Sequence, residues 1–412
     1  MSDRQSSADV VVVGAGPAGA TAATLLARAG RSVVMVDKAV FPRDKCCGDG
    51  LTTLALRELE ALGLLPEMVP NWKSVDAAWL RSPSGREVCV PLLGKGIFAA
   101  TTPRRELDAA LVDLAIAAGA HVIQGHAVHA VRQSPSSVEV GIDGGDVGDR
   151  AGTIQARYVV AADGMWSATR KALGVGEPGY LGEWHAFRQY ARNVSGPAAE
   201  RLIVWFEPDL LPGYMWSFPL PGGRVNIGFG VQRDGVRRVR DMKQQWDDLL
   251  RRPHVVEALG GGFELEDRHT AWPIPAGIDR ATLATGRVCF VGDAAMATDT
   301  MTGEGIGQAV LTARLAAEAI IAGGALDPDT VARRYRSTVR HHLLADHKMS
   351  VQLSKVLSHE LGARGAIRLL ASSDWSRRNF ARWMFEDEPR AIVFTPSRWH
   401  RHFLHQQAPY QP

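Results

Sequence analysis

Cysteine is scarce in this 412-residue sequence, which contains only four. Two of them are adjacent, Cys46 and Cys47, and the other two, Cys89 and Cys289, lie far apart. No C-x-x-C pair and no cysteine–histidine spacing typical of a metal site occurs, so we expect neither a disulfide framework nor a bound metal ion. So few cysteines are typical of the reducing cytoplasm, where we expect this protein to work.

Long apolar runs and a strong net charge are also absent. The longest apolar candidate, residues 309–322, is interrupted by Arg314 and Glu318, so we expect no membrane-spanning helix. Residues 1–9 are polar and lack the apolar segment of a signal peptide. The net charge of +3 is too small to argue for a nucleic-acid partner. We therefore expect a globular protein with small-molecule ligands.

Glycine, by contrast, is concentrated in a motif near the start of the chain. Residues 14–19, Gly-Ala-Gly-Pro-Ala-Gly, match the G-x-G-x-x-G fingerprint of a dinucleotide-binding βαβ unit. The context fits, because an apolar strand at 10–13 precedes the motif, an alanine-rich helix at 20–29 follows it, and a second strand at 32–36 ends at Asp37. The glycines let the backbone approach a pyrophosphate, and the helix N-terminus stabilises its charge. Asp37 is placed to accept a hydrogen bond from a ribose hydroxyl.

Two later segments indicate that the dinucleotide is FAD. One contains Asp163 and Gly164 after an apolar strand, and the other begins at Asp293 and continues to the glycine-rich turn 303–307. A nicotinamide cofactor would use contiguous βαβ units, whereas these signals are spread over most of the chain. This spread fits an extended cofactor, with Asp293 near its ribityl chain. N–H groups of the turn would then face the flavin ring, which becomes anionic on reduction.

The pattern changes over residues 181–284, where strands follow one another without intervening helices except around 236–260. Alternation along one of these strands places Tyr214, Trp216 and Phe218 on the same face. Three large aromatic side chains make a flat apolar wall that suits an isoprenoid chain or an aromatic ring, and a packed sheet core is the alternative. We predict an antiparallel sheet that is inserted into the nucleotide domain and lines the pocket of a hydrophobic small-molecule substrate.

The last part of the chain, residues 331–412, is basic, with 14 lysines and arginines against 6 acidic residues. Aromatic and basic side chains interleave over residues 375–385. Two interpretations stay open here. Such a segment suits peripheral contact with a membrane surface, and it equally suits a solvated helical cap whose apolar face packs on the core.

Taken together, the motifs resemble the FAD-dependent oxidoreductases with the p-hydroxybenzoate hydroxylase type of fold, and within them the geranylgeranyl reductase family. The resemblance covers about residues 8–330. It rests on the glycine motif with Asp37, Phe41-Pro42-Arg43-Asp44-Lys45, Cys47-Gly48-Asp49-Gly50, Pro103-Arg104, Asp163-Gly164, Tyr214-x-Trp216-x-Phe218-Pro219, Gly292-Asp293-Ala294-Ala295 and Thr302-Gly303-Glu304-Gly305-Ile306.

This resemblance implies an α/β fold with three parts: a Rossmann-like FAD-binding domain, an inserted antiparallel β-sheet substrate domain and a helical C-terminal region. We expect a discontinuous FAD-binding domain at 1–70, 96–180 and 285–330, a substrate domain at 71–95 and 181–284, and the helical region at 331–412.

The resemblance also implies roles for individual residues. Arg104 is expected near the pyrophosphate or ribityl chain, and Cys47 beside the isoalloxazine. Cys47 and the aromatic residues Tyr214, Trp216 and Phe218 are the candidate catalytic residues. The residues expected to bind the cofactor are Gly14, Gly16, Ala18, Gly19, Asp37, Lys38, Arg43, Cys47, Gly48, Arg104, Val128, Asp163, Gly164, Asp293, Gly303, Gly305 and Ile306.

The activity that the resemblance implies is reduction of C=C bonds in a geranylgeranyl or menaquinone-like prenyl chain, by hydride transfer from reduced flavin. NADPH or another electron carrier would reduce the flavin and bind transiently, since no second nucleotide-binding motif is visible. The alternative is a flavin-dependent monooxygenase that hydroxylates an aromatic or polyketide-like metabolite, because the fold and most FAD motifs serve both chemistries. One departure stands out: Asp299-Thr300-Met301 occupies the place of a proline that the family usually carries before Thr302.

Overall fold

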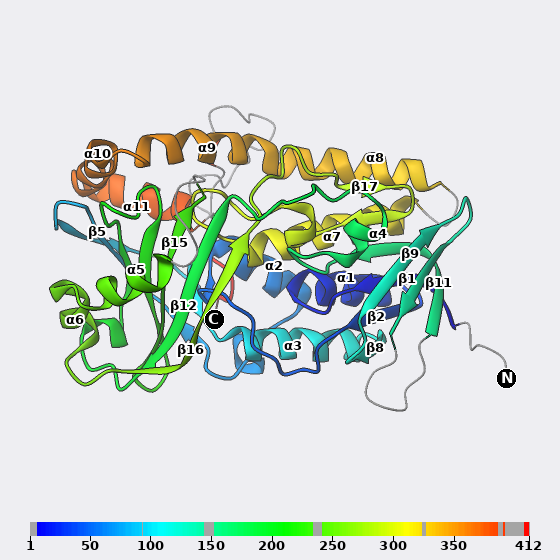
Figure 1. Cartoon of the computed structure of the whole chain (residues 1–412), viewed down its shortest axis with the longest axis horizontal. Coiled ribbons are helices and arrows are strands. Elements are labelled where there is room, and N and C mark those ends of the chain that lie inside the picture. The colour runs from blue at the N-terminus through cyan, green and yellow to red at the C-terminus, as the bar shows by residue number, and fades with distance from the viewer. Residues whose placement is uncertain are drawn as a thin grey trace.

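The computed structural model describes residues 6–92, 94–143, 152–233, 241–323, 327–385, 390–391 and 408–411. Two large sheets lie side by side, and helices of the C-terminal region run along both of them (Figure 1). The predicted α/β fold with an inserted sheet and a helical C-terminal region is confirmed.

The first sheet carries the glycine motif and has eight strands. Its main path runs β17-β18-β11-β1-β2-β8, and β9 and β10 extend it from β11. Strands β1, β2, β8, β11 and β18 pair in parallel. Valines at positions 10–13 are almost completely buried, as expected for a parallel strand covered on both faces. The bounds are β1 Ser6–Val13, β2 Val33–Asp37, β8 His121–Gln124, β9 Val128–Gln133, β10 Val138–Ile142, β11 Gly152–Ala161, β17 Ala284–Thr285 and β18 Val288–Phe290.

Helices pack on this sheet and form one core with it. α1 follows the glycine motif directly and contacts α3 and α7. Helix α7 is long and apolar enough to cross a bilayer, but 72% of it is buried inside the protein, as in a core helix. The bounds are α1 Pro17–Arg28, α2 Thr53–Leu62, α3 Arg104–Ala117, α4 Ala168–Ala172, α7 Ile306–Gly323 and α8 Pro328–Val339.

The second sheet has seven strands in the order β16-β12-β15-β14-β13-β5-β6. Its strands are antiparallel except for the parallel pair β5 and β13. Helices α5 (Asp241–Leu250) and α6 (Pro253–Leu259) pack on one face around the buried Trp246. The bounds are β5 Ala77–Arg81, β6 Glu87–Pro91, β12 Trp184–Arg192, β13 Leu202–Trp205, β14 Tyr214–Leu220, β15 Arg224–Gln232 and β16 Glu264–Ile274.

A third, small sheet joins β3 (Gly50–Leu51), β7 (Ala100–Thr101) and β4 (Lys73–Ser74). It anchors the end of the segment 41–50, which runs between the two large sheets.

The C-terminal region is helical in its described part, with a π-helical turn at Arg340–Leu344 between α8 and α9. α9 is Ala345–Leu357, α10 is Glu360–Ala371 and α11 is Asp374–Met384. The buried faces of α10 and α11 form a core with β5, β6 and β13 through Ile367, Leu370 and Ala381. These helices therefore cover part of the second sheet (Figure 1).

Candidate active site

One large cavity of about 1300 Å³ lies between the two large sheets and the C-terminal helices. It extends from the glycine motif, past the segment 43–48 and the turn 302–306, to the inner faces of α9, α10 and α11. Ligand pockets typically measure roughly 300–1000 Å³, so this cavity has room for more than one ligand. Every residue named above as a cofactor or catalytic candidate lines it except Gly19.

The three glycines of the motif have different structural roles. Gly14 has φ of +96°, and a Cβ there would lie 2.4 Å from the carbonyl oxygen of Ala162. A Cβ at Gly19 would lie 1.7 Å from the carbonyl oxygen of Gly14, so Gly19 packs α1 against the turn instead of facing the cavity. Gly16 does face it, and its nearest side chains are the guanidinium groups of Arg43 and Arg104.

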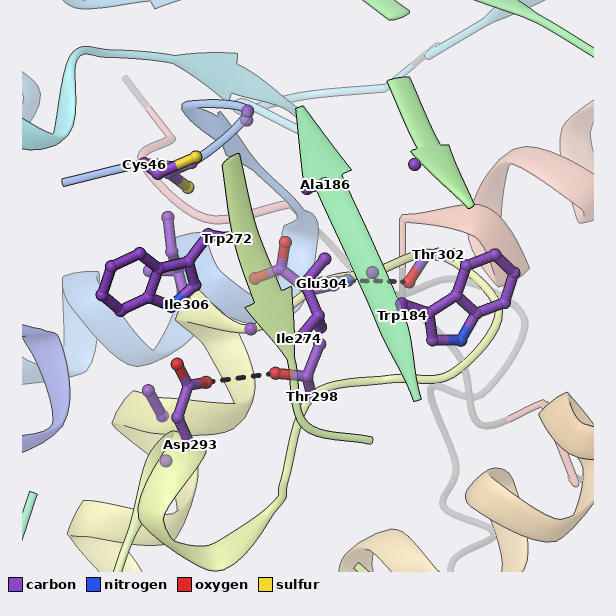
Figure 2. Close-up of a pocket in the computed structure, with 18 of the residues that line it drawn as sticks. Cys46, Trp184, Ala186, Trp272, Ile274, Asp293, Thr298, Thr302, Glu304 and Ile306 are labelled. Atoms are coloured by element: carbon purple, nitrogen blue, oxygen red, sulfur yellow. Dashed lines mark hydrogen bonds between the residues drawn. The ribbon is translucent and has the colours of Figure 1, made fainter. Parts of the chain in front are cut away.

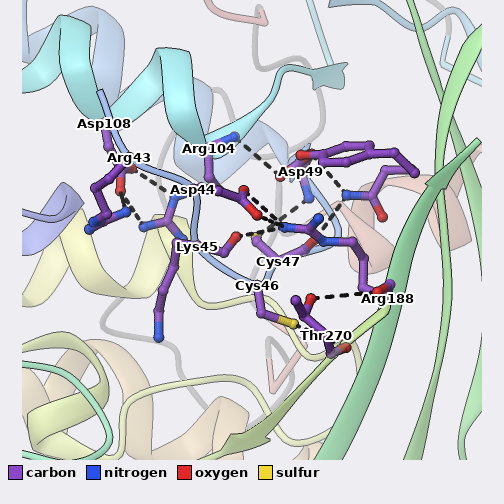
Figure 3. A network of polar contacts seen from close by, with 12 residues as sticks. Arg43, Asp44, Lys45, Cys46, Cys47, Asp49, Arg104, Asp108, Arg188 and Thr270 are labelled. Carbon is purple, nitrogen blue, oxygen red and sulfur yellow. Dashed lines mark hydrogen bonds and ion pairs between the residues drawn. The ribbon is translucent and has the colours of Figure 1, made fainter. Parts of the chain in front are cut away.

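These two arginines converge on one buried carboxylate, Asp108 of α3. Arg43 Nη1 lies 2.6 Å from Asp108 Oδ2, and Arg104 contacts both carboxylate oxygens at 2.7 and 2.8 Å (Figure 3). Two guanidinium groups and one carboxylate leave a net positive charge at the N-terminus of α1. Helix N–H groups and this cation pair make an anion-binding site that fits a pyrophosphate.

Asp37 ends β2 and holds the turn as well as facing the cavity. Its Oδ2 accepts a hydrogen bond from the Ala15 N–H at 2.7 Å, and its Oδ1 accepts one from the Ala39 N–H at 2.8 Å. Each carboxylate oxygen retains a further lone pair for a ligand hydroxyl. Lys38 and Val128 line the same end of the cavity.

Asp163 fixes the loop that follows β11. Its carboxylate accepts hydrogen bonds from the Ser167 hydroxyl at 2.6 Å and from the Thr169 N–H at 2.9 Å. Burial raises its pKa. Because its oxygens are occupied by its own loop, the structure gives Asp163 a positioning role beside Gly164, whose φ is +74°.

Asp293 and the turn at 302–306 lie next to each other on the cavity wall, and a Cβ at Gly305 would lie 4.0 Å from Asp293 Oδ1 (Figure 2). Asp293 Oδ1 accepts a hydrogen bond from the Thr298 hydroxyl at 3.2 Å. Gly303 has φ of +70°, which suits the sharp turn before α7. Glu304 Oε1 accepts a hydrogen bond from the Gly307 N–H at 2.6 Å, and burial raises the pKa of Glu304. Gly305 and Ile306 complete this wall.

Asp299 explains how the turn is held without the proline that the resemblance led us to expect. Its Oδ1 accepts hydrogen bonds from the N–H groups of Met301 and Thr302 at 3.0 and 2.8 Å. Its Oδ2 pairs with the buried Arg390 at 2.5 Å and with Ser350 of α9 at 3.0 Å. A side-chain network that includes the C-terminal region thus fixes the conformation that a proline ring would otherwise restrict.

The adjacent cysteines are free thiols. Burial raises the pKa of Cys47 to about 11, so its thiol is protonated at neutral pH. Cys46 has its Sγ 3.7 Å from the carbonyl oxygen of Thr270, and burial raises its pKa too. Neither environment favours the thiolate that thiol–disulfide exchange needs. Cys47 is therefore placed as a neutral wall residue beside Gly48.

Tyr214, Trp216 and Phe218 line the cavity from one face of β14. Successive ring centroids are 6.2 Å apart. The Trp216 indole N–H donates a hydrogen bond to Asn226 Oδ1 at 3.0 Å, and the Tyr214 hydroxyl donates one to the carbonyl oxygen of Thr302. The aromatic wall therefore reaches the turn before α7.

A buried network that the sequence reasoning missed joins the segment 41–50 to the second sheet (Figure 3). Asp49 accepts hydrogen bonds from the Tyr190 hydroxyl at 2.5 Å and from Asn226 Nδ2 at 2.8 Å. Burial raises the pKa of Asp49 to about 6. Arg188 of β12 binds Asp44 at 3.0 Å and also the carbonyl oxygen of Lys45. The only sequence signal was the position of Asp49 in the Cys-Gly-Asp-Gly motif.

Within the described ranges, no group of three or more histidine, cysteine, aspartate or glutamate side chains is arranged to hold a metal ion. Trp272 Nε1 and Lys45 Nζ are among the donors on the cavity wall that have no acceptor in the described part of the chain, and the Trp272 atom is also buried. Orphaned donors, the anion site at Gly16 and the acceptors at Asp37 and Asp293 together fit a long anionic dinucleotide.

Comparisons with known proteins agree with this geometry. Residues 7–323 match the family described as FAD binding domain. A menaquinone reductase of Mycolicibacterium smegmatis is 35% identical over 349 residues, 78% of each chain. A digeranylgeranylglycerophospholipid reductase of Methanopyrus kandleri is 29% identical and covers 88% of this chain and 94% of its own.

Solved structures show the same fold. A geranylgeranyl bacteriochlorophyll reductase-like protein of Thermoplasma acidophilum superposes with a TM-score of 0.78 over 95% of this chain and 98% of its own, at 20% identity. A flavin-dependent brominase superposes with a TM-score of 0.75 over 95% of this chain and 98% of its own, at 18% identity. The protein is thus an FAD-dependent oxidoreductase with the p-hydroxybenzoate hydroxylase type of fold. Within that class, the chain belongs to the geranylgeranyl reductase family.

Proposed function

We propose that the protein reduces C=C bonds of a prenyl chain attached to a quinone or another lipid. The observation that carries this proposal is the continuity of the cavity from the cofactor end to α10 and α11. Past the aromatic wall the lining is mostly apolar, with Val204, Ile367, Leu370 and Phe380 among its residues. An elongated apolar channel fits an isoprenoid chain better than it fits a single aromatic ring.

The named relatives support the same substrate class, since they are reductases of menaquinone and of digeranylgeranylglycerophospholipid. Reduced FAD, when bound, supplies a hydride. The wall of Tyr214, Trp216 and Phe218 holds the chain in place and excludes water from it. NADPH or another electron carrier binds transiently to reduce the cofactor.

The proposal also includes contact with the cytoplasmic surface of a membrane, from which the substrate would enter the cavity. Four large apolar side chains line the cavity and are also exposed: Val356, Leu369, Trp375 and Trp383. They come from α9, α10 and α11, so the mouth of the cavity is apolar. Helices α10 and α11 carry five arginines against two carboxylates, which favours an anionic lipid surface.

Mass spectrometry tests the activity. Purified holoenzyme, an electron donor and a prenyl quinone are incubated without oxygen, and we expect the prenyl tail to gain two hydrogens per reduced bond. Asp293→Ala serves as the matched control, because loss of the acceptor near the cofactor should weaken FAD retention by roughly 1.5–3 kcal/mol and leave the apolar channel intact. Gain of an oxygen atom in air, with no tail reduction, would instead identify a monooxygenase.

A further inference from the structure

Lys45 places its ammonium group at the cofactor end of the cavity, where it forms no salt bridge with the described residues. Its Nζ lies 3.1 Å from the ring centroid of Trp272 on β16. In the described part of the chain no oxygen accepts a hydrogen bond from it and no carboxylate pairs with it. Figure 3 shows the side chain extending away from the polar network formed by its neighbours.

The neighbouring cations are arranged differently. Arg43 and Arg104 share Asp108, and Arg188 pairs with Asp44. Lys45 is half-buried, and the cost of partly removing its ammonium group from water is offset in part by the face of Trp272. Burial lowers the pKa of Lys45 to about 8; Asp293 opposes this shift, while Arg104 and Arg43 add to it. Unlike these arginines, Lys45 forms no salt bridge, so its ammonium group remains available to an anionic ligand in the cavity.

Trp272 supplies a second, independent observation. Its indole Nε1 is buried and has no hydrogen-bond partner among the described residues. The side chain lies on the cavity wall (Figure 2). Native structures rarely leave a buried donor unsatisfied. Lys45 Nζ over the ring face and Trp272 Nε1 at the ring edge are two donors on one wall of one cavity, and a ligand with several acceptor oxygens would satisfy both.

We propose that Lys45 and Trp272 bind the FAD cofactor. The Lys45 ammonium pairs with a negative charge on FAD, and the Trp272 N–H donates a hydrogen bond to an acceptor atom of FAD. Two parts of the cofactor carry negative charge: the pyrophosphate, in both redox states, and the ring, when it is reduced. The pair links the segment 41–50 of the first part of the chain to β16 of the second sheet, so bound cofactor joins the two.

The test uses apoprotein of wild type, Lys45→Met, Lys45→Arg and Trp272→Phe, with Lys171→Met, an exposed lysine on α4, as the matched control. FAD is titrated by flavin fluorescence in the oxidised and the reduced state. A hydrogen bond to a charged group is worth about 1.5–3 kcal/mol and a neutral one about 0.5–1.5 kcal/mol. We therefore expect Lys45→Met to weaken binding about 10- to 100-fold and Trp272→Phe about 3- to 10-fold. Lys45→Arg should retain most of the affinity, and Lys171→Met all of it.

Titration of the oxidised and the reduced cofactor distinguishes the pyrophosphate from the flavin ring as the group that Lys45 binds. Equal weakening in both assigns Lys45 to the pyrophosphate. Weakening of the reduced form alone assigns it to the ring and lowers the two-electron midpoint potential by about 30 mV per tenfold.

Thermal unfolding of the apoprotein separates cofactor binding from a merely structural role. Because Lys45→Met removes an unpaired charge, the apoprotein should unfold at the same or a higher temperature, while the stabilisation by added FAD shrinks. The proposal is overturned if Lys45→Met leaves FAD affinity unchanged in both redox states, or if it destabilises the apoprotein without changing that affinity.

Discussion

Asp49 is a carboxyl group held where ionisation is costly. It is completely buried, and burial raises its pKa from 3.8 to about 6. Between these two values the folded protein retains a proton that the unfolded chain has released. The free energy of unfolding contributed by this group therefore falls as pH rises from about 4 to about 6.

Asp49→Asn removes this pH dependence, because an amide does not titrate. The backbone tolerates the change, since Asp49 has φ of +63°, a conformation that asparagine adopts readily. Urea unfolding at several pH values should show wild type losing up to about 3 kcal/mol relative to Asp49→Asn across this window, at about 1.4 kcal/mol per pKa unit. Asp113→Asn, on the exposed face of α3, should keep the wild-type profile. Parallel profiles for wild type and Asp49→Asn would contradict the pKa argument.

At the same scale, the sequence could not reveal the buried network of Asp49 or the contact of Lys45 with Trp272. The hydrogen bond of Asp49 with Tyr190 spans 141 positions, and nothing local to either residue encodes it. Motif spacing did indicate the glycine turn, because there the backbone itself forms the site within six consecutive residues. Sites assembled from short-range geometry are readable in the sequence, whereas contacts between distant segments depend on how two sheets pack.

Elements were easier to predict than contacts. The order β1-α1-β2 follows from an apolar strand, a glycine turn and an alanine-rich helix, each with its own period. Alternation along β14 likewise placed three aromatic side chains on one face, and the structure has all three on the cavity. The parallel pairing of β5 with β13 was not predictable, because the intervening chain forms parts of both large sheets.

Strand β15 offers a test of the aromatic wall at the level of elements. Gly228 lies opposite Trp216, and a Cβ there would lie 2.4 Å from the Trp216 ring and from the carbonyl oxygen of Phe187. Gly230, two residues on, has nothing within 4 Å of the position of its Cβ. Both also lie in the same antiparallel ladder.

Gly228→Ala should therefore displace the Trp216 ring, lower the melting temperature by several degrees and reduce turnover, since overpacking costs about 1–3 kcal/mol. Gly230→Ala should leave the melting temperature close to wild type, because its Cβ meets no neighbouring atom. Differential scanning calorimetry and steady-state rates on holoenzyme of equal FAD content make the comparison. Equal behaviour of the two variants would mean that the close approach at Gly228 does not position the wall.

At the scale of the whole molecule, helices α10 and α11 pack on the second sheet with one face and expose apolar side chains on the other. Ile367, Leu370 and Ala381 pack inward, whereas Leu361, Leu369 and Trp375 are 80%, 71% and 71% exposed. The sequence left a helical cap and a membrane contact as alternatives for this region. The helices pack as a cap, and their outward residues are the basis of the proposed membrane contact.

Vesicle sedimentation tests that contact. The double variant Leu369→Ser and Trp375→Ser should bind vesicles containing anionic lipid at least about tenfold more weakly, because burying each side chain is worth roughly 1.5–3 kcal/mol. Leu265→Ser with Val256→Ser is the matched control, since both residues are exposed and neither lines the cavity. The control should bind like wild type. If the proposal holds, turnover of a vesicle-embedded prenyl lipid falls in the first variant, while turnover of a detergent-dispersed one is retained. Equal vesicle binding by both double variants would place the contact elsewhere on the molecule.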